Sequence, residues 1–195
     1  MFSVRVQGKY RRRSARISEF ARSLLTDAVN GYAVRDNASE NEGAPMKTIF
    51  DAVTYDEITR RLEALQPGAP RQWGKMTAAQ MLEHTARAAE MATGAKRLKQ
   101  ATLGRMIGWI FRKDFVGEKP FGKNGPTGPD FIVTGIDPDF GTAKARLKSI
   151  LDDLHALGEK GCDGNVHAFF GPMTGAEWGV TQYKHVDHHL RQFGA

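Results

Sequence analysis

Residues 174–193 read TGAEWGVTQYKHVDHHLRQF, and this stretch decides which kind of fold the chain can form. Thr174 and Glu177 have the spacing of a capping box, in which two side chains satisfy free backbone N–H groups at the start of a helix. A stripe at helical spacing then follows and consists of Trp178, Gln182, His185, His189 and Phe193. Because the stripe begins and ends with aromatic residues, we predict a helix whose histidine-bearing face points toward the core.

The other apolar residues are also arranged mainly in helical patterns. Thr77 and Gln80 form a second capping box, and Pro67-Gly68 ends an earlier apolar stripe. The sequence predicts helices at 54–65, 77–94, 103–112, 139–157 and 174–193. Only residues 131–134 and 166–170 have β-like composition, and both are also compatible with extended loop. We therefore expect an all-α fold, a bundle of four long helices with a short extra helix and long loops.

The net charge of the chain is concentrated at its N-terminus. Residues 1–22 carry seven Lys or Arg and one Glu, whereas residues 23–195 carry 21 basic and 21 acidic side chains. The basic segment could contact nucleic acid or anionic lipid through its charge, and it also has the composition of a transit peptide. We favour a third interpretation, a disordered extension or translation from an upstream start codon, because Met46 follows a polar linker at 36–45.

The expected organisation is therefore a basic extension and linker at 1–45 and one helical domain at 46–195. The neutral balance outside the first 22 residues argues against nucleic acid as a partner of the domain itself. No apolar run approaches the ~20 residues that a membrane-spanning helix needs. Cys162 is the single cysteine, which excludes a disulfide framework and suits a reducing cytoplasm. It lies in a glycine-rich stretch, and we expect it to face solvent rather than act as a nucleophile.

Three histidines have the positions that a metal site requires. His185 and His189 are four residues apart, so both imidazoles lie on one helix face and can bind the same ion. His84 lies between Met81 and Ala88 on the apolar face of another helix, where its ring needs a polar partner. Three neutral histidines around a divalent ion leave one coordination position open, which is typical of catalytic metal sites.

Each of these residues also has a simpler interpretation. Histidines near the end of a helix complement the negative end of its dipole, and a lone histidine on an apolar face is often a hydrogen-bonded core residue. His155 and His167 lie outside the stripe, and His188 is one position away from it. The pattern alone leaves both interpretations open.

Residues 72–84, QWGKMTAAQMLEH, together with Trp178-Gly179 and residues 183–194, resemble the DinB/YfiT-like superfamily, and within it a bacterial branch of unknown function. The resemblance covers residues 46–195. It implies an up-down four-helix bundle in which His84, His185 and His189 bind zinc or nickel. Some members of the superfamily resemble transferases that use low-molecular-weight thiols, and others resemble metal-dependent hydrolases or isomerases.

The resemblance and the histidines favour a metal-dependent enzyme, a transferase or hydrolase, that activates a water or a low-molecular-weight thiol toward a small-molecule substrate. The alternative is a non-enzymatic helical module that binds or senses a ligand. Gln192 lies one turn beyond His189 and could orient that ligand imidazole, or it could be an exposed terminal residue. Other polar candidates near the histidines are Glu83, Gln182 and Asp187, of which we expect Asp187 on the outer face.

Residues 103–112, LGRMIGWIFR, are too apolar to be left bare. They could form a lid, or a patch that faces a membrane or a partner. We favour packing against the bundle or against a second copy in a homodimer.

Overall fold

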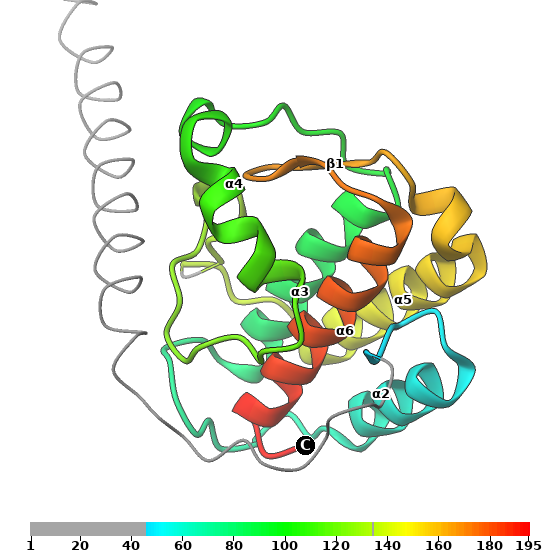
Figure 1. The fold of residues 1–195 in the computed structure, drawn as a ribbon. Coiled ribbons are helices and arrows are strands. Elements are labelled where there is room, and N and C mark those ends of the chain that lie inside the picture. The colour runs from blue at the N-terminus through cyan, green and yellow to red at the C-terminus, as the bar shows by residue number, and fades with distance from the viewer. Residues whose placement is uncertain (1–45, 134) are drawn as a thin grey trace, which may run out of the picture. The chain divides into compact units, whose positions relative to one another are not determined.

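The computed structural model describes residues 46–133 and 135–195, so the expected extension and linker at 1–45 lie outside the described residues. The described part is mostly helical, as expected for an all-α protein (Figure 1). Its helices are α2 (Ala52–Ala64), α3 (Ala78–Ala92), α4 (Thr102–Val116), α5 (Phe140–Cys162), α6 (Gly175–Gln192) and the 3-10 turn η1 (Pro129–Phe131). The strands β1 (Val166–His167) and β2 (Gly171–Pro172) form one short antiparallel pair.

The helix predictions are confirmed for the position of every helix, but two ends differ. α4 continues four residues beyond the predicted end, to Val116. α5 continues to Cys162, although its backbone leaves helical geometry at Gly158, with φ 60° and ψ −171°. The predicted end at residue 157 is therefore correct for the first part of that helix, because the backbone leaves helical geometry at Gly158 in a left-handed conformation that suits glycine. In the β-like segment at 131–134, Phe131 ends η1 and no strand includes the described residues.

Two units make up the described residues. Residues 124–132, with η1, form one of them. The other, which we call the helical body, comprises residues 46–123, 133 and 135–195. In the body, α3 packs against α5 and α6, α5 also packs against α6, and α2 contacts both α5 and α6. α4 contacts α6, and β1 contacts α3.

The core of the body is built from the apolar stripes of α2, α3, α5 and α6. Its largest fully buried side chains on these helices are Ile58, Leu62, Met81, Leu82, Leu147, Leu151, Leu154, Trp178 and Leu190. Burial of each such side chain stabilises the fold by roughly 1.5–3 kcal/mol. Trp178, the first residue of the histidine stripe, is completely buried, and its indole N–H donates to the backbone carbonyl of Asn165 at 3.1 Å. The face that carries the histidines therefore points inward, as predicted.

Both predicted capping boxes are present at the starts of α3 and α6. The Gln80 N–H donates to Thr77 Oγ1 at 3.2 Å, and the Thr77 N–H donates to Gln80 Oε1 at 3.0 Å. Thr174 and Glu177 make the same reciprocal pair at 3.2 and 2.8 Å. Each box fixes the residue at which its helix begins and thus the register in which its histidines are presented.

Two expectations about single residues were wrong. Cys162 is fully buried at the end of α5 and does not face solvent, and this burial raises the pKa of its thiol to about 11. Asp187 does not lie on an outer face, because its carboxylate is 2.8 Å from the Arg61 guanidinium of α2. Among the described residues, no helix is long and apolar enough to cross a membrane.

Replacement of Gly175 by Ala should destabilise the fold. A Cβ at this first residue of α6 would overlap the backbone carbonyl of Glu159, so α5 and α6 would have to move apart. We expect a loss of about 1–3 kcal/mol in the free energy of unfolding, measured by urea denaturation. Gly68→Ala is the matched control, because nothing lies within 4 Å of a Cβ there. Equal stability of the two variants would contradict the described contact between α5 and α6.

Candidate metal centre

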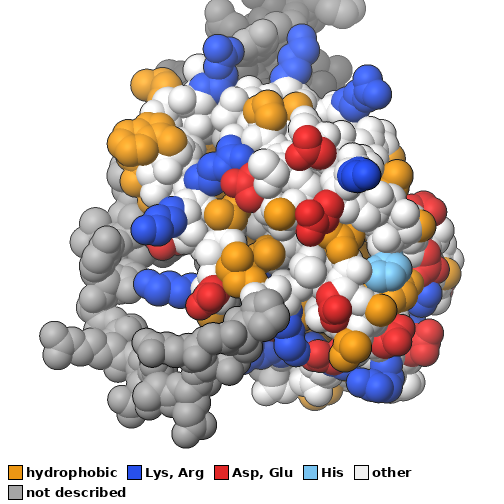
Figure 2. All heavy atoms as spheres, turned by 45° about the vertical axis from the view of Figure 1, so that its right-hand side comes forward, with side chains coloured by type: hydrophobic (Ala, Val, Ile, Leu, Met, Phe, Trp, Pro, Cys, Tyr) orange, Lys and Arg blue, Asp and Glu red, His pale blue; other side chains and the backbone are white. Residues whose placement is uncertain are grey.

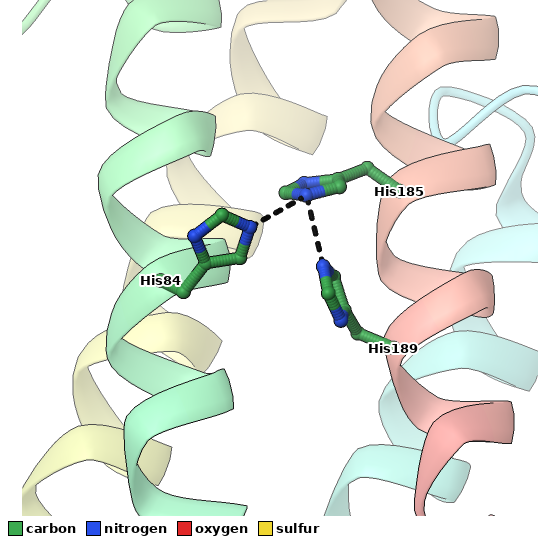
Figure 3. Close-up of side chains that lie close together, drawn as sticks. All are labelled: His84, His185 and His189. Carbon is green, nitrogen blue, oxygen red and sulfur yellow. Dashed lines mark hydrogen bonds between the residues drawn. The ribbon is translucent and has the colours of Figure 1, made fainter. Parts of the chain in front are cut away.

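The three predicted histidines converge between α3 and α6. His84 Nε2 is 3.2 Å from His185 Nε2, and His189 Nε2 is 3.1 Å from the same atom. One ring nitrogen from each of the three histidines lies within 4.8 Å of the others. Figure 3 shows the three rings pointing toward one another, His84 from one helix and the other two from the facing helix.

The helices α3 and α6 run in opposite directions, and their offset brings the three histidines together. The C-terminal end of α3 lies beside the N-terminal end of α6, because Asn165 links the two. Its side-chain amide donates to the Ala92 carbonyl at 2.7 Å, while its own carbonyl accepts the Trp178 indole N–H. From these ends, the helices bring the middle of α3 opposite the second half of α6, where the histidines lie.

The tautomer of His189 is fixed by Gln192. The Gln192 amide N–H donates to the Trp73 carbonyl at 2.9 Å, so its Oε1 must be the atom that lies 2.9 Å from His189 Nδ1. Since an amide oxygen can only accept, Nδ1 carries the ring proton and Nε2 of the neutral ring presents a lone pair. That lone pair faces His185. Gln192 is 3% exposed, so the alternative of an exposed terminal glutamine was wrong.

Burial keeps the imidazoles of His185 and His189 neutral. Burial, together with the neighbouring His84, lowers the pKa of His189 to about 3. Burial also holds the pKa of His185 well below its ordinary value, with the other two rings acting in the same direction. Both effects disfavour a second positive charge on rings that already face one another.

The spacing of the rings is compatible with one shared cation. Two nitrogens bound at ~2.0–2.1 Å to a tetrahedral ion lie about 3.3 Å apart, close to the observed 3.1 and 3.2 Å. A cation would accept lone pairs from all three rings, whereas one ring proton bridges only two of them. The donor set and its neutrality thus make this cluster a candidate metal site.

The other three histidines do not join the cluster. His155 Nδ1 lies 3.0 Å from the Ile49 carbonyl, and its ring stacks on Tyr55 at 4.1 Å. His167, in β1, accepts the backbone N–H groups of Phe169 and Phe170 at 3.1 and 3.2 Å, and burial lowers its pKa to about 4.

His188 packs beside the cluster rather than in it. Its ring centroid is 5.4 Å from that of Trp73 and 6.4 Å from that of Phe121. His188 therefore lies beside the ligand stripe, as its place one position away from the stripe in the sequence indicates.

The carboxylates suggested by the sequence are bound to cations. Glu83 pairs with Arg87 at 2.7 Å and with Arg146 at 2.6 Å, and Asp187 pairs with Arg61. Gln182 differs from both. It is 4% exposed, and its Oε1 has no hydrogen-bond partner among the described residues. Since Gln182 precedes His185 by three residues on the same helix face, this unpaired acceptor lies on the histidine side of α6.

A feature that the sequence reasoning missed is the attachment of α4 next to the cluster. The Lys184 ammonium donates to the carbonyls of Phe115 and Gly117 at 2.8 and 2.6 Å, and so caps the end of α4. It also lies 4.7 Å from the ring of Phe121, which is 6.4 Å from the His185 ring. Burial lowers the pKa of Lys184 to about 8. The position of Lys184 next to His185 in the sequence did not indicate that its side chain would cap a distant helix.

The lowered histidine pKa values predict an acid-sensitive fold in the metal-free protein. The histidines of the unfolded chain take up protons near their ordinary pKa of 6.5, whereas those of the folded chain stay neutral until the pH nears 4 for His167 and 3 for His189. Stability is therefore fully present above pH 6.5 and declines below it, by up to about 1.4 kcal/mol per pH unit for each histidine. The free energy of unfolding in urea, with a chelator present, should be compared at about pH 7 and about pH 5.5. Both values lie above the pH range in which carboxylates titrate, so the difference reports on the histidines. Equal stability at both values would contradict the buried, neutral cluster.

The comparisons with known proteins place the chain in a family without assigning it a reaction. Residues 47–195 match a family model described as protein of unknown function (DUF1569). No curated protein matches the chain, and no solved structure matches it. The match extends over nearly all of the helical domain expected from the sequence, and it includes His84, His185, His189 and Gln192. The chain therefore belongs to the DUF1569 family of proteins of unknown function.

Proposed function

We propose that His84, His185 and His189 bind one divalent metal ion, zinc or nickel, and that the protein is a metal-dependent enzyme acting on a small molecule. The observation that carries the proposal is the approach of three Nε2 atoms from two helices to 3.1 and 3.2 Å in a buried setting. Three neutral imidazoles suit either ion. The proposal includes an up-down four-helix bundle of the DinB/YfiT-like kind, which the antiparallel course of α3 and α6 supports.

The residues around the cluster have definable roles in such a site. Gln192 holds the proton on His189 Nδ1 and so keeps Nε2 available as a donor. Since its own amide is anchored on the Trp73 carbonyl, it also fixes the orientation of the ring. Gln182 Oε1 offers an unpaired acceptor to a substrate that carries a hydroxyl or N–H group.

A divalent ion held by three neutral histidines lowers the pKa of a bound water or thiol toward neutrality and leaves a position open for it. That chemistry suits a hydrolase, or a transferase that uses a low-molecular-weight thiol. The reaction needs the open side of the site to stay accessible to the small molecule.

A second candidate is a helical module that binds or senses a ligand without converting it. The observation in its favour is the pairing of Glu83 with two arginines and of Asp187 with Arg61, which leaves neither carboxylate free to act as a general base. Turnover of thioester, ester or epoxide test substrates by the metal-loaded protein would favour the enzyme. Ligand-induced stabilisation without turnover would favour the module.

Replacement of His185 by Ala should abolish metal retention. We expect about one zinc or nickel per chain in protein purified without an affinity tag, and a loss of at least tenfold in the variant, because the central donor of the three is removed. His155→Gln is the matched control, since this histidine bonds to the Ile49 carbonyl and lies outside the cluster. Elemental analysis of the three proteins measures the effect. Normal metal content in His185→Ala would contradict the site.

Replacement of Gln192 by Leu should weaken metal binding without removing a ligand. Loss of the contact that fixes the His189 tautomer is expected to lower affinity by about 10- to 100-fold, as for other groups that orient a metal ligand. Competition with a chromophoric chelator measures the affinity. Gln72→Leu is a suitable control, because that side chain is exposed and its amide donates to the Pro70 carbonyl rather than to a histidine. Unchanged affinity in Gln192→Leu would remove this residue from the site.

A further inference from the structure

Helix α4 exposes an apolar stripe that the helical body does not cover. Met106, Trp109 and Ile110 are 68%, 74% and 51% exposed. Their spacing of three and four residues places them on one face of the helix, and the exposed Lys113 continues the same stripe. The expectation that residues 103–112 pack against the bundle is therefore wrong for this face, although the opposite face does pack.

The opposite face of α4 fixes the helix so that the stripe must point outward. Gly104 and Gly108 are buried against the backbone of Phe169, and a Cβ at Gly104 would overlap the Phe169 carbonyl. Only glycine permits so close an approach. Because contact through these two glycines sets the rotation of the helix, α4 cannot roll to bury Trp109.

Polar contacts hold α4 in this orientation near its C-terminal end. The Arg112 guanidinium pairs with Glu177 of α6 at 2.6 Å and donates to the carbonyls of Phe170 and Pro172 at 3.2 and 3.0 Å. Lys184 caps the last turn, as described above. A helix anchored to α6 and to the β1–β2 hairpin presents its apolar stripe as a rigid feature of the surface.

The segment of the chain that carries the stripe is basic. Residues 95–119 contain seven Lys or Arg and two Asp or Glu, whereas the rest of 46–195 contains 13 basic and 15 acidic residues. Arg97, Lys99, Arg105 and Lys113 are exposed. On the face drawn in Figure 2, hydrophobic and basic side chains lie next to one another toward the upper left, the side on which Figure 1 draws α4.

We propose that this stripe with its basic border, which we call the α4 surface, docks on an anionic lipid bilayer and lies in the headgroup region without crossing it. Tryptophan, methionine and isoleucine on one face supply the apolar contact, and tryptophan in particular suits the membrane–water interface. Lys113 and Arg105 can extend their charged ends toward lipid phosphates while their stems lie along the apolar surface. Each basic residue near an anionic surface adds roughly 1 kcal/mol of attraction.

The charge argues against a second copy of this chain as the occupant. In a symmetric dimer the same surface faces itself, so the basic borders of two α4 surfaces would be brought together. An acidic bilayer complements this charge and also accommodates the apolar stripe. The inference is independent of the metal site, because no residue of the α4 surface belongs to the histidine cluster.

Vesicle binding by the full-length chain tests the proposal. Sedimentation with vesicles of about 70% phosphatidylcholine and 30% phosphatidylglycerol should retain the protein, and neutral phosphatidylcholine vesicles should retain at least fivefold less. The double variant Trp109→Glu with Ile110→Glu should lose at least tenfold in binding. Val53→Glu is the matched control, because Val53 is a 78% exposed apolar residue on α2, away from the α4 surface. Circular dichroism should show all variants folded.

Fluorescence separates docking through α4 from attraction of the basic N-terminal segment. Trp178 is fully buried and Trp73 is partly buried, whereas Trp109 is 74% exposed. A blue shift of emission on vesicle addition should therefore come mainly from Trp109, and most of it should vanish in Trp109→Phe while sedimentation persists. Equal sedimentation of the double variant and the wild type would overturn the proposal. A dimer that depends on Trp109, or binding of polyglutamate without binding of vesicles, would also overturn it and identify a second copy or an acidic protein as the occupant.

Discussion

Three imidazoles, of which His84 and His189 are buried and His185 is partly buried, face one another between α3 and α6, and this arrangement constrains the rest of the helical body. The two helices run antiparallel, and their offset is fixed, because a shift of one residue would turn a ring away from the centre. The capping boxes at Thr77 and Thr174 set where the helices begin, and Asn165 ties the end of one to the start of the other. Burial removes the charge from the rings, so what remains is a set of neutral nitrogen donors. Such a set is costly to bury without a partner and favourable around a cation.

Local patterns in the sequence predicted the helices and the histidine cluster because both depend on short spacings. The stripe from Trp178 to His189 lies within a single helix, and so does each of the two capping boxes. The pairing of His84 with the other two histidines was a weaker inference, since it joins segments a hundred residues apart, and it rested on the apolar face around His84 and on the resemblance. The same resemblance led to the expected extent of the domain, residues 46–195, which stays a prediction.

Contacts between distant segments account for what the sequence could not predict. Asp187 was expected outside because its helix face was judged without α2, whose Arg61 covers it. Cys162 was expected to face solvent because the predicted helix ended at residue 157. In the structure α5 resumes after Gly158 and continues to Cys162, which the usual signals for helix ends do not predict. The role of Gln192 depends on the Trp73 carbonyl, and the cap that Lys184 provides depends on the end of α4. For Asp187, Gln192 and Lys184, a polar side chain bonds to a partner in a distant segment that local sequence patterns do not specify.

The central claim is that the three histidines are ligands of one divalent ion. The most direct test is a crystal structure of the metal-loaded protein with diffraction data collected on both sides of the absorption edge of zinc or nickel. The account predicts one anomalous peak per chain, ~2.0–2.1 Å from Nε2 of His84, His185 and His189, with the Gln192 amide still on His189 Nδ1. An anomalous peak at another position would contradict this claim. So would a structure at saturating metal concentration in which the three imidazoles hydrogen-bond to one another and hold no ion.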